Sequence, residues 1–241
     1  MKNILEFKDK FKGQRCFIIG NGPSLNKIDI SILKNEISFG VNSIFLMTKT
    51  NGFRPTFFVV EDNLVFKENQ KEIDKYSGVI KILPKQYAKQ LKCKKECYIF
   101  EMDTAFYNKN DKTYAIPQFY SSDKSTFYCG QSVTYINMQL AYFMGFSEVI
   151  LIGMDFSYSL PTGHHQDGNH IKATCDDVNH FHKDYFGQGK TWKDPRLGRV
   201  LRSYHKAKYM YKADGRKILN ATPGGQLHLF ERVNFESLFD N

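Results

Sequence analysis

The sequence of 241 residues contains little cysteine, and its cysteines do not fit a disulfide framework. There are five, an odd number without framework spacing, which indicates a reducing compartment. Cys93 and Cys97 form a lone pair with no second pair to complete a zinc site. No apolar run reaches the roughly 18 residues of a membrane-spanning helix, and residues 1–13 lack the apolar centre of a signal peptide. We therefore expect a cytoplasmic protein without a transmembrane helix.

Familiar nucleic-acid-binding signatures are also missing. The chain carries 34 Lys and Arg against 25 Asp and Glu, a formal net charge of +9. This balance suits anionic partners such as nucleotides, acidic glycans or a phospholipid surface, and simple solubility is the alternative explanation. Because no zinc-finger, RRM or homeodomain signature accompanies the charge, we expect no nucleic-acid partner.

Alternating strand and helix patterns predict an α/β fold. We expect a single Rossmann-like domain over residues 1–241, with a mostly parallel sheet and helices on both faces. The predicted strands are 16–19, 37–41, 56–60, 79–83, 98–100, 148–152 and 217–221. Residues 1–14 are predicted to be a basic amphipathic lead-in, 85–95 a solvated lysine-rich segment and 103–125 a long connection.

The stretch 15–25 is predicted to be the centre of the protein. A short apolar run, 16–19, ends abruptly at Gly20-Asn21-Gly22, followed by Pro23 and Ser24. Glycines lack Cβ atoms, so backbone N–H groups could approach a bound phosphate here, and Asn21 could both donate and accept hydrogen bonds. The spacing is neither Gly-x-Gly-x-x-Gly nor a P-loop. A plain strand-to-helix turn is the alternative.

Polar residues follow the next two predicted strands as well. Asn42 follows the second strand, and Glu61-Asp62-Asn63 follows the third. In open parallel sheets, ligands bind beyond the carboxyl ends of the strands, so this repetition favours a ligand site. Asn and Asp are also common turn formers, which is the alternative explanation.

A second glycine turn follows a predicted helix and strand. Gly130 and Ser132, a suitable N-cap, precede an apolar helical pattern over 133–144. The strand 148–152 then ends at Gly153, with Asp155 and Phe156 close behind. Asp155 could accept from an amide, ribose or base, hold a metal, or only cap a turn.

The segment 159–193 is predicted to be a lid-like insertion. Residues 161–189 look irregular and hold five of the seven histidines, namely His164, His165, His170, His180 and His182. Long irregular insertions near a site are often lids. Asp194-Pro195 is predicted to open an amphipathic helix with proline at its first position. Its apolar stripe is expected to be core and not a cofactor site; the stripe is Leu197, Val200, Leu201, Tyr204, Ala207 and Tyr211.

Two blocks of sequence resemble known families when taken together. The stretch from Ile18 to Leu25, followed by Ile28-Asp29, resembles the opening of bacterial CMP-sialic-acid sialyltransferases that decorate lipooligosaccharides. The block from Gly130 to Tyr158 looks like the second nucleotide-contacting block of that family. Both blocks, with a tail like 220–225, also look like MptE-like proteins, named for an archaeal 6-hydroxymethylpterin diphosphokinase. Bacterial members of that group often belong to surface-polysaccharide and flagellin-glycosylation systems.

The resemblance implies roles for particular residues. In the first block, Asn21, Gly22 and Ser24 would contact phosphate or ribose. Asn42 and Asn63 would hold the nucleotide, and Ser132, Asp155 and Phe156 would line the base or sugar. The full expected nucleotide-binding set is Gly20, Asn21, Gly22, Ser24, Asn42, Asn63, Gly130, Ser132, Gly153, Asp155 and Phe156.

The sialyltransferase resemblance also implies an inverting mechanism in which a lid histidine deprotonates the acceptor hydroxyl. The lid of this chain differs in length and composition, so His170, His180 and His182 each stay candidates, with His180 favoured. Tyr158 and Tyr185 are candidates for the tyrosine pair that assists departure of the phosphate.

The favoured interpretation is a metal-independent glycosyltransferase without a cofactor. Its expected partners are a nucleotide sugar, with a CMP-linked nonulosonic acid as the first guess, and a bacterial surface-glycan or glycolipid acceptor. Contact with the inner face of the membrane and a homo-oligomer are further expectations. One alternative is a Mg²⁺-dependent diphosphotransferase using Glu61, Asp62 and Asp155. The other is a non-catalytic nucleotide-binding scaffold in glycan assembly.

Overall fold

A computed structural model describes residues 1–121, 125–159, 165–168 and 170–240. Its main sheet has the strand order β1-β6-β5-β4-β3-β2-β8-β12-β13, with β7 paired to β6, and its described strand pairs are parallel. The bounds are β1 Lys2–Asn3, β2 Arg15–Ile19, β3 Ser38–Val41, β4 Phe57–Val59, β5 Ile80–Pro84, β6 Cys97–Asp103, β7 Thr126–Tyr128, β8 Glu148–Ile152, β12 Lys217–Asn220 and β13 Glu231–Arg232. The predicted mostly parallel α/β fold is confirmed.

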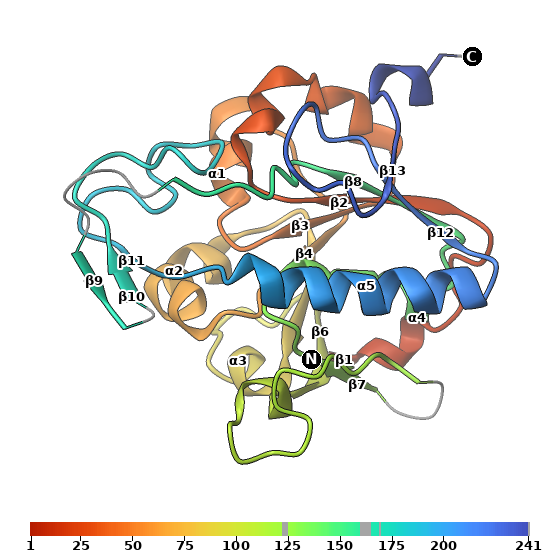
Figure 1. The fold of residues 1–241 in the computed structure, drawn as a ribbon, viewed down its shortest axis with the longest axis horizontal. Helices are drawn as coiled ribbons and strands as arrows, with labels where there is room; N and C mark the ends of the chain where they lie inside the picture. The colour runs from red at the N-terminus through yellow and green to blue at the C-terminus, as the bar shows by residue number, and fades with distance from the viewer. Residues whose placement is uncertain (122–124, 160–164, 169, 241) are drawn as a thin grey trace.

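Helices cover both faces of this sheet. The α-helices are α1 Phe45–Asn51, α2 Asn63–Lys75, α3 Lys85–Ala88, α4 Val133–Phe143 and α5 Leu197–Ala213. Short 3₁₀ turns are η1 Ile4–Phe7, η2 Pro23–Lys27, η3 Ile30–Asn35, η4 Ala105–Tyr107 and η5 Glu236–Leu238. Figure 1 shows α5 lying across the front of the sheet.

The central strand β2 supplies side chains to two hydrophobic cores. Cys16 and Ile18 pack into the core under α4, α5 and η1, whereas Phe17 and Ile19 pack into the core under α1, α2, α3 and the 3₁₀ turns η2 and η3. Successive side chains of a strand point to opposite faces, so a continuous apolar run is what a doubly covered strand requires. This is why the run 16–19 could be recognised as a buried strand.

The order of the strands reverses between β2 and β8. From β2 the chain proceeds through β3, β4, β5 and β6 in one direction, and β8 and β12 then add on the other side of β2. At such a switch point, the loops that leave adjacent strands diverge and leave a crevice for a ligand. The two predicted glycine turns leave these two strands.

Several local predictions are wrong. The lead-in 1–14 is part of the fold, because Lys2 pairs with Tyr98 and because Ile4 and Phe7 are buried. Helix α5 begins at Leu197 instead of at Pro195, since Arg196 takes a left-handed conformation with φ of 46°. The lysines of 85–95 are exposed, as predicted, but Tyr87 and Leu91 of the same segment are buried.

The predicted lid-like segment 159–193 contains a small sheet of its own. It is antiparallel, in the order β11-β10-β9, with bounds β9 His165–Asp167, β10 His170–Lys172 and β11 Thr191–Lys193. Residues 160–164 and 169 of the segment, including His164, lie outside the described residues. Figure 1 shows this sheet beside α2, at one end of the molecule. No described helix combines the length and apolarity needed to cross a bilayer.

The close approach of β2 and β8 predicts an effect of Gly20→Ala. A Cβ at Gly20 would clash with the carbonyl oxygen of Gly153 and lie 2.9 Å from Sδ of Met154. Overpacking of this kind costs on the order of 1–3 kcal/mol, which lowers Tm by about 2–4 °C per kcal/mol in a protein of this size. Thermal unfolding followed by circular dichroism measures the change.

Gly198→Ala is the matched control. Nothing lies within 4 Å of its Cβ position in the first turn of α5, and alanine favours helix, so Tm should hold or rise. An unchanged Tm for Gly20→Ala would show that the two turns do not require this close approach.

Candidate active site

The two glycine turns meet in space and are joined by hydrogen bonds. The N–H of Gly20 donates to the carbonyl of Ile152 (2.8 Å), and the N–H of Gly22 donates to the carbonyl of Gly153 (3.0 Å). A Cβ at Gly22 would overlap the carboxylate of Asp155, so glycine is required there. Two stretches about 130 residues apart in the chain thus form one rigid unit.

Asp155 holds this unit together through its side chain. Its carboxylate accepts from the hydroxyl of Ser24 (2.6 Å) and from the backbone N–H of Ser24 (3.2 Å). The segment that follows β12 joins the same unit. The N–H of Gln226 donates to the carbonyl of Asp155, and the N–H of Met154 donates to the hydroxyl of Thr222. We call this unit of Gly20–Ser24, Gly153–Asp155 and Thr222–Gln226 the clip.

The clip corrects one expectation about the first turn. The N–H groups of Gly20, Gly22 and Ser24 were predicted to face a bound phosphate, but they bond to Ile152 at the end of β8 and to Gly153 and Asp155 in the second turn. The two glycines are needed for the close approach of two backbones rather than for approach to an anion. A phosphate in this site would therefore need donors other than these three N–H groups.

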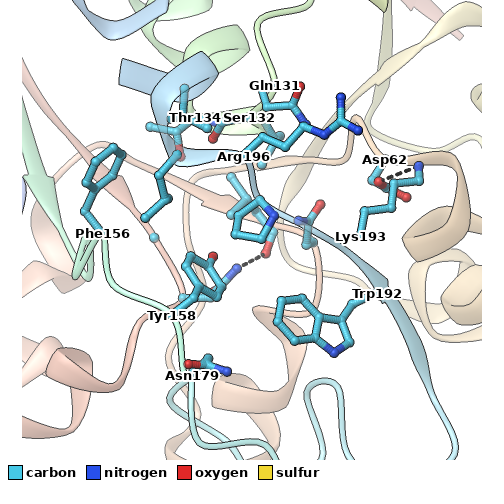
Figure 2. A pocket seen from close by; sticks show the side chains of 18 of the residues that line it. Asp62, Gln131, Ser132, Thr134, Phe156, Tyr158, Asn179, Trp192, Lys193 and Arg196 are labelled. Atoms are coloured by element: carbon cyan, nitrogen blue, oxygen red, sulfur yellow. Dashed lines mark hydrogen bonds and ion pairs between the residues drawn. The ribbon is translucent and has the colours of Figure 1, made fainter. Parts of the chain in front are cut away.

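The cavity beside the clip has a volume of about 520 Å³. Its walls come from the ends of β2, β3, β4 and β8, from the N-terminal ends of α2, α4 and α5, from the connection before β7, and from the segment 159–193. Figure 2 shows Trp192, Tyr158 and Asn179 on one side and Gln131, Ser132 and Thr134 across from them. The cavity is large enough for a nucleotide-sized ligand.

Most residues predicted for the site line this cavity. They are Gly20, Asn21, Gly22, Asn42, Ser132, Gly153, Asp155, Phe156, Tyr158, His180 and Tyr185. Ser24 lies behind the wall in the clip, and Asn63 lies at the edge, where its side chain accepts from Lys193. Gly130 is packed against Tyr135 and Ser203, so its lack of a side chain makes room for the core.

Unpaired oxygens at the cavity indicate what a ligand must bring. Asn21 donates its amide to the carbonyl of Val41 (3.1 Å) and to the hydroxyl of Tyr185 (2.8 Å), which fixes its orientation. Its buried Oδ1 has no hydrogen-bond partner among the described residues, and neither do Oδ1 of Asn42 and Oε1 of Gln131. Because buried acceptors are normally satisfied, a ligand with hydroxyl or N–H donors fits here.

Tyr185 brings the segment 159–193 onto the strand ends. Its ring is buried, and its hydroxyl lies between Asn21 and Asn42 at the ends of β2 and β3. Burial raises the pKa of Tyr185, an effect that its hydrogen bonds to Asn42, Ser43 and Asn21 only partly oppose. Its hydroxyl therefore stays protonated at neutral pH and can act as a donor.

His180 stacks on Tyr185 and is oriented by Asp177. The rings lie 4.0 Å apart and nearly parallel, and Nδ1 of His180 lies 2.7 Å from a carboxylate oxygen of Asp177. Both side chains are almost fully buried, with 9% of His180 and 4% of Asp177 exposed. A histidine that bonds to a carboxylate through Nδ1 presents Nε2 as its free nitrogen.

Asp177 is held as a carboxylate. Burial alone would raise its pKa, but the hydrogen bond and charge of His180 and the backbone N–H groups of Asn179 and Phe186 outweigh burial and lower the pKa. The same N–H groups lie within 2.9 Å of its two oxygens. Asp177 is thus a fixed negative partner for the imidazole.

The other described candidate histidines are outside the cavity. His170 is exposed on β10, and His182 accepts from the N–H of Asp184 near the surface. Neither of them is a lining residue. Of the three candidates left open by the sequence, His180 alone lines this cavity.

Cationic side chains line the part of the cavity formed by α5 and the connection before β7. They are Lys109, Lys193, Arg196 and Arg199. Lys193 pairs with Asp62 (2.9 Å), the dashed contact at the edge of Figure 2. Arg199 donates to the carbonyl of Phe106 and lies over the rings of Phe106 and Tyr114.

Helix α5 also begins at this cavity. Arg196 occupies its N-cap position and makes no side-chain capping hydrogen bond, whereas Ser132 and Asp62 cap α4 and α2. The N-terminal end of a helix carries partial positive charge and unpaired N–H groups. An anionic group of a ligand is favoured there. Leu197, Val200 and Tyr204 also line the cavity, so this end of the predicted core stripe is part of the site.

Glu61 is a buried acid at the end of β4. Burial and the charge of Asp62 raise its pKa, while hydrogen bonds from Tyr107 and Cys129 oppose the rise. The hydroxyl of Tyr107 donates to Glu61 at 2.8 Å. Within the described ranges, no group of three or more His, Cys, Asp or Glu side chains has the spacing to hold a metal ion.

Sequence reasoning missed several residues of the site. Asp177 precedes His180 by three positions, and an acid near a candidate base could have been noticed. Trp192 is the single tryptophan of the chain and stacks near Phe186 and Tyr158. No pattern in the sequence could have placed Lys109 or Arg199, because both reach the cavity only through the tertiary fold.

Comparisons with known proteins agree with this fold. The structure matches that of the MAf glycosyltransferase from Magnetospirillum magneticum AMB-1, with a TM-score of 0.58, 14% identity, and coverage of 98% of this chain and 38% of that one. The likeness shows a shared fold, and this chain spans well under half of that protein. A weaker match is the sialyltransferase CstII from Campylobacter jejuni, solved with cytidine-5'-monophosphate, with a TM-score of 0.39, 17% identity, and coverage of 92% and 85%.

No curated protein matches the chain. A family model does match it: the model described as 6-hydroxymethylpterin diphosphokinase MptE-like covers residues 1–160, about two thirds of the sequence. The MptE-like resemblance read from the two glycine blocks is thereby confirmed, and the chain belongs to the MptE-like family.

Proposed function

We propose that this protein is a glycosyltransferase that moves a sugar from a nucleotide donor onto a bacterial surface-glycan acceptor. The observation that carries the proposal is that His180, oriented by Asp177, lines the same cavity as the switch point between β2 and β8. A positioned base beside a nucleotide-sized crevice is what transfer to a hydroxyl requires.

The proposed donor lies across the strand ends. Its ribose or base hydroxyl and N–H groups would donate to the unpaired oxygens of Asn21, Asn42 and Gln131. Its anionic groups would face the start of α5 with Arg196 and Lys109. Charge-assisted hydrogen bonds contribute roughly 1.5–3 kcal/mol each, so a few of them suffice to hold a nucleotide.

In the proposed reaction, Nε2 of His180 takes the proton of the acceptor hydroxyl. The acceptor oxygen bonds to the anomeric carbon as the bond from that carbon to the phosphate oxygen breaks, with inversion. Tyr185, protonated because burial raises its pKa, would donate a hydrogen bond to the departing phosphate, and Tyr158 lies beside His180 (rings 5.9 Å apart). Segment 159–193, which carries all of these groups except Tyr158, would act as the lid.

A CMP-linked nonulosonic acid is the first donor that we propose. Its carboxylate adds a second anion to the phosphate, and the cationic part of the cavity offers more than one positive group to meet them. The motif of the first turn supports this choice through its resemblance to the CMP-sialic-acid enzymes.

A Mg²⁺-dependent diphosphotransferase is the second candidate, favoured by the description of the family model. The carboxylates nominated for the metal all have protein partners. Asp155 bonds to Ser24, Asp62 caps α2 and pairs with Lys193, and Glu61 accepts from Tyr107. A metal would have to displace at least two of these contacts, so the donor set fits Mg²⁺ poorly.

The test of the function combines a donor screen with chelation. Thermal shift against CMP, UDP, GDP and ADP identifies the nucleotide, and mass spectrometry follows transfer from the matching sugar nucleotide to a glycan acceptor. We expect stabilisation by CMP and transfer that persists in EDTA. Loss of sugar transfer in EDTA with recovery in Mg²⁺ would contradict the metal-independent reaction. Mg²⁺-dependent transfer of diphosphate from ATP to a hydroxymethylpterin, without sugar transfer, would favour the diphosphotransferase, and binding without turnover would favour a scaffold.

The role of His180 predicts that His180→Ala lowers kcat by about 10²–10⁴-fold, the usual contribution of a general base. Nucleotide affinity should hold, because the base contacts the acceptor. His182→Ala is the matched control in the same segment and should keep its rate. If the two variants have equal turnover, His180 is not the base.

Asp177→Asn should make stability depend less on pH. The pKa of Asp177 is lower in the folded protein than in the unfolded chain, where it is near 3.9. Its carboxylate therefore contributes fully to stability above the unfolded pKa, and this contribution is lost as pH falls through the folded pKa. The wild type should exceed the variant by about 1–3 kcal/mol near pH 6, and the gap should narrow progressively as pH falls below about 4. Urea unfolding at several pH values measures it; a gap that is independent of pH contradicts the carboxylate role.

A further inference from the structure

The side of α5 that faces away from the sheet carries several basic side chains and no acidic one. Its buried side consists of Val200, Ser203, Tyr204, Ala207 and Tyr211. The opposite side, which we call the outward face of α5, consists of Arg202, His205, Tyr209 and Lys212, flanked by Lys206 and Lys208. No Asp or Glu occurs anywhere in the helix.

This pattern is not that of an ordinary solvated helix. Like charges at i and i+4, such as Arg202 with Lys206 and Lys208 with Lys212, slightly destabilise a helix, whereas opposite charges stabilise it. Helix α2 of the same protein has the ordinary pattern, because its exposed side mixes Lys67, Lys71 and Lys75 with Glu68 and Glu72. Solubility alone explains α2 but not α5.

The outward face of α5 is also accessible. Figure 1 shows the helix running along the front of the molecule, with no other helix in front of it. Tyr209 is 68% exposed in the middle of the face, and the ammonium of Lys206 lies over its ring. Lys208 donates to the carbonyl of Leu229, which leaves the charge of Lys208 at the surface.

We propose that the outward face of α5 docks the protein on an anionic phospholipid surface. A helix of 17 residues is straight and about 25 Å long, so its charges form a line that a flat surface can meet at once. Each Lys or Arg near such a surface strengthens binding roughly fivefold. An exposed tyrosine between basic residues is typical of the membrane interface.

This proposal does not depend on the reaction that the cavity carries out. It does bear on where the cavity would lie relative to the membrane, because the start of α5 is part of the cavity wall through Leu197, Arg199 and Val200. A surface bound along α5 would lie next to the site, where a lipid-linked acceptor could reach it.

The test is co-sedimentation of the full chain with phosphatidylcholine vesicles that contain or lack phosphatidylglycerol, at about 0.1 M salt. We expect binding only to the anionic vesicles. The triple variant Arg202→Glu, Lys206→Glu, Lys212→Glu should bind at least about 100-fold more weakly. Its matched control carries the same charge change on α2, as Lys67→Glu, Lys71→Glu, Lys75→Glu, and should keep most of the binding.

Three outcomes would overturn the proposal. The first is failure of the wild type to bind anionic vesicles. The second is an equal loss of binding by the α2 and α5 variants. The third is binding to RNA without binding to either vesicle type. Circular dichroism checks folding of each variant. Should the glutamate variant fail to fold, the neutral triple glutamine variant at the same positions and Tyr209→Ser replace it, each with a smaller expected loss.

Discussion

The contact between the loops that leave β2 and β8 is the constraint on which the site depends. The carboxylate of Asp155 bonds to Ser24, and the backbone of each loop bonds directly to the other. Such closeness is possible only where side chains are absent, which explains Gly20, Gly22 and Gly153. The rigidity obtained in this way fixes one wall of the cavity, against which Asn21, Asn42 and the described residues of segment 159–193 are positioned.

The described part of segment 159–193 is in turn anchored to the strand ends. Asn21 accepts the N–H of Phe181 through its backbone and donates to Tyr185 through its side chain, and Asn26 donates to the carbonyl of Phe181. Tyr185 supports the ring of His180, and Asp177 sets its orientation. A chain of contacts therefore runs from the clip to the base, so the catalytic geometry proposed here is built from the first strand outward.

The sequence made the α/β fold predictable, together with the grouping of several nominated residues around one cavity, but not the contacts that these residues make with one another. Strands could be identified because the run 16–19 and its counterpart at 148–152 must be apolar on both faces. Asn21, Asn42 and Asp155 could be placed near one another because parallel strands share a carboxyl edge. The use of Asp155 and of the glycine N–H groups in the clip could not be foreseen. The same residue types would be expected whether their hydrogen bonds are made to the protein or to a ligand. Lys109, Arg199 and Trp192 were missed because nothing local to them signals which cavity they reach.

The parallel arrangement also joins parts of the chain that are far apart in sequence. Strand β2 pairs on one side with β3, close in the chain, and on the other with β8, which comes more than a hundred residues later. Contacts so distant along the chain make folding slow. Helix α4 likewise depends on the distant α5, because the hydroxyl of Tyr211 donates to the carbonyl of Met138 and the hydroxyl of Tyr204 lies 3.2 Å from that of Ser132. Residues 1–160, which the family model matches, do not include α5, so a chain that ended there would leave the side of α4 that packs against α5 uncovered.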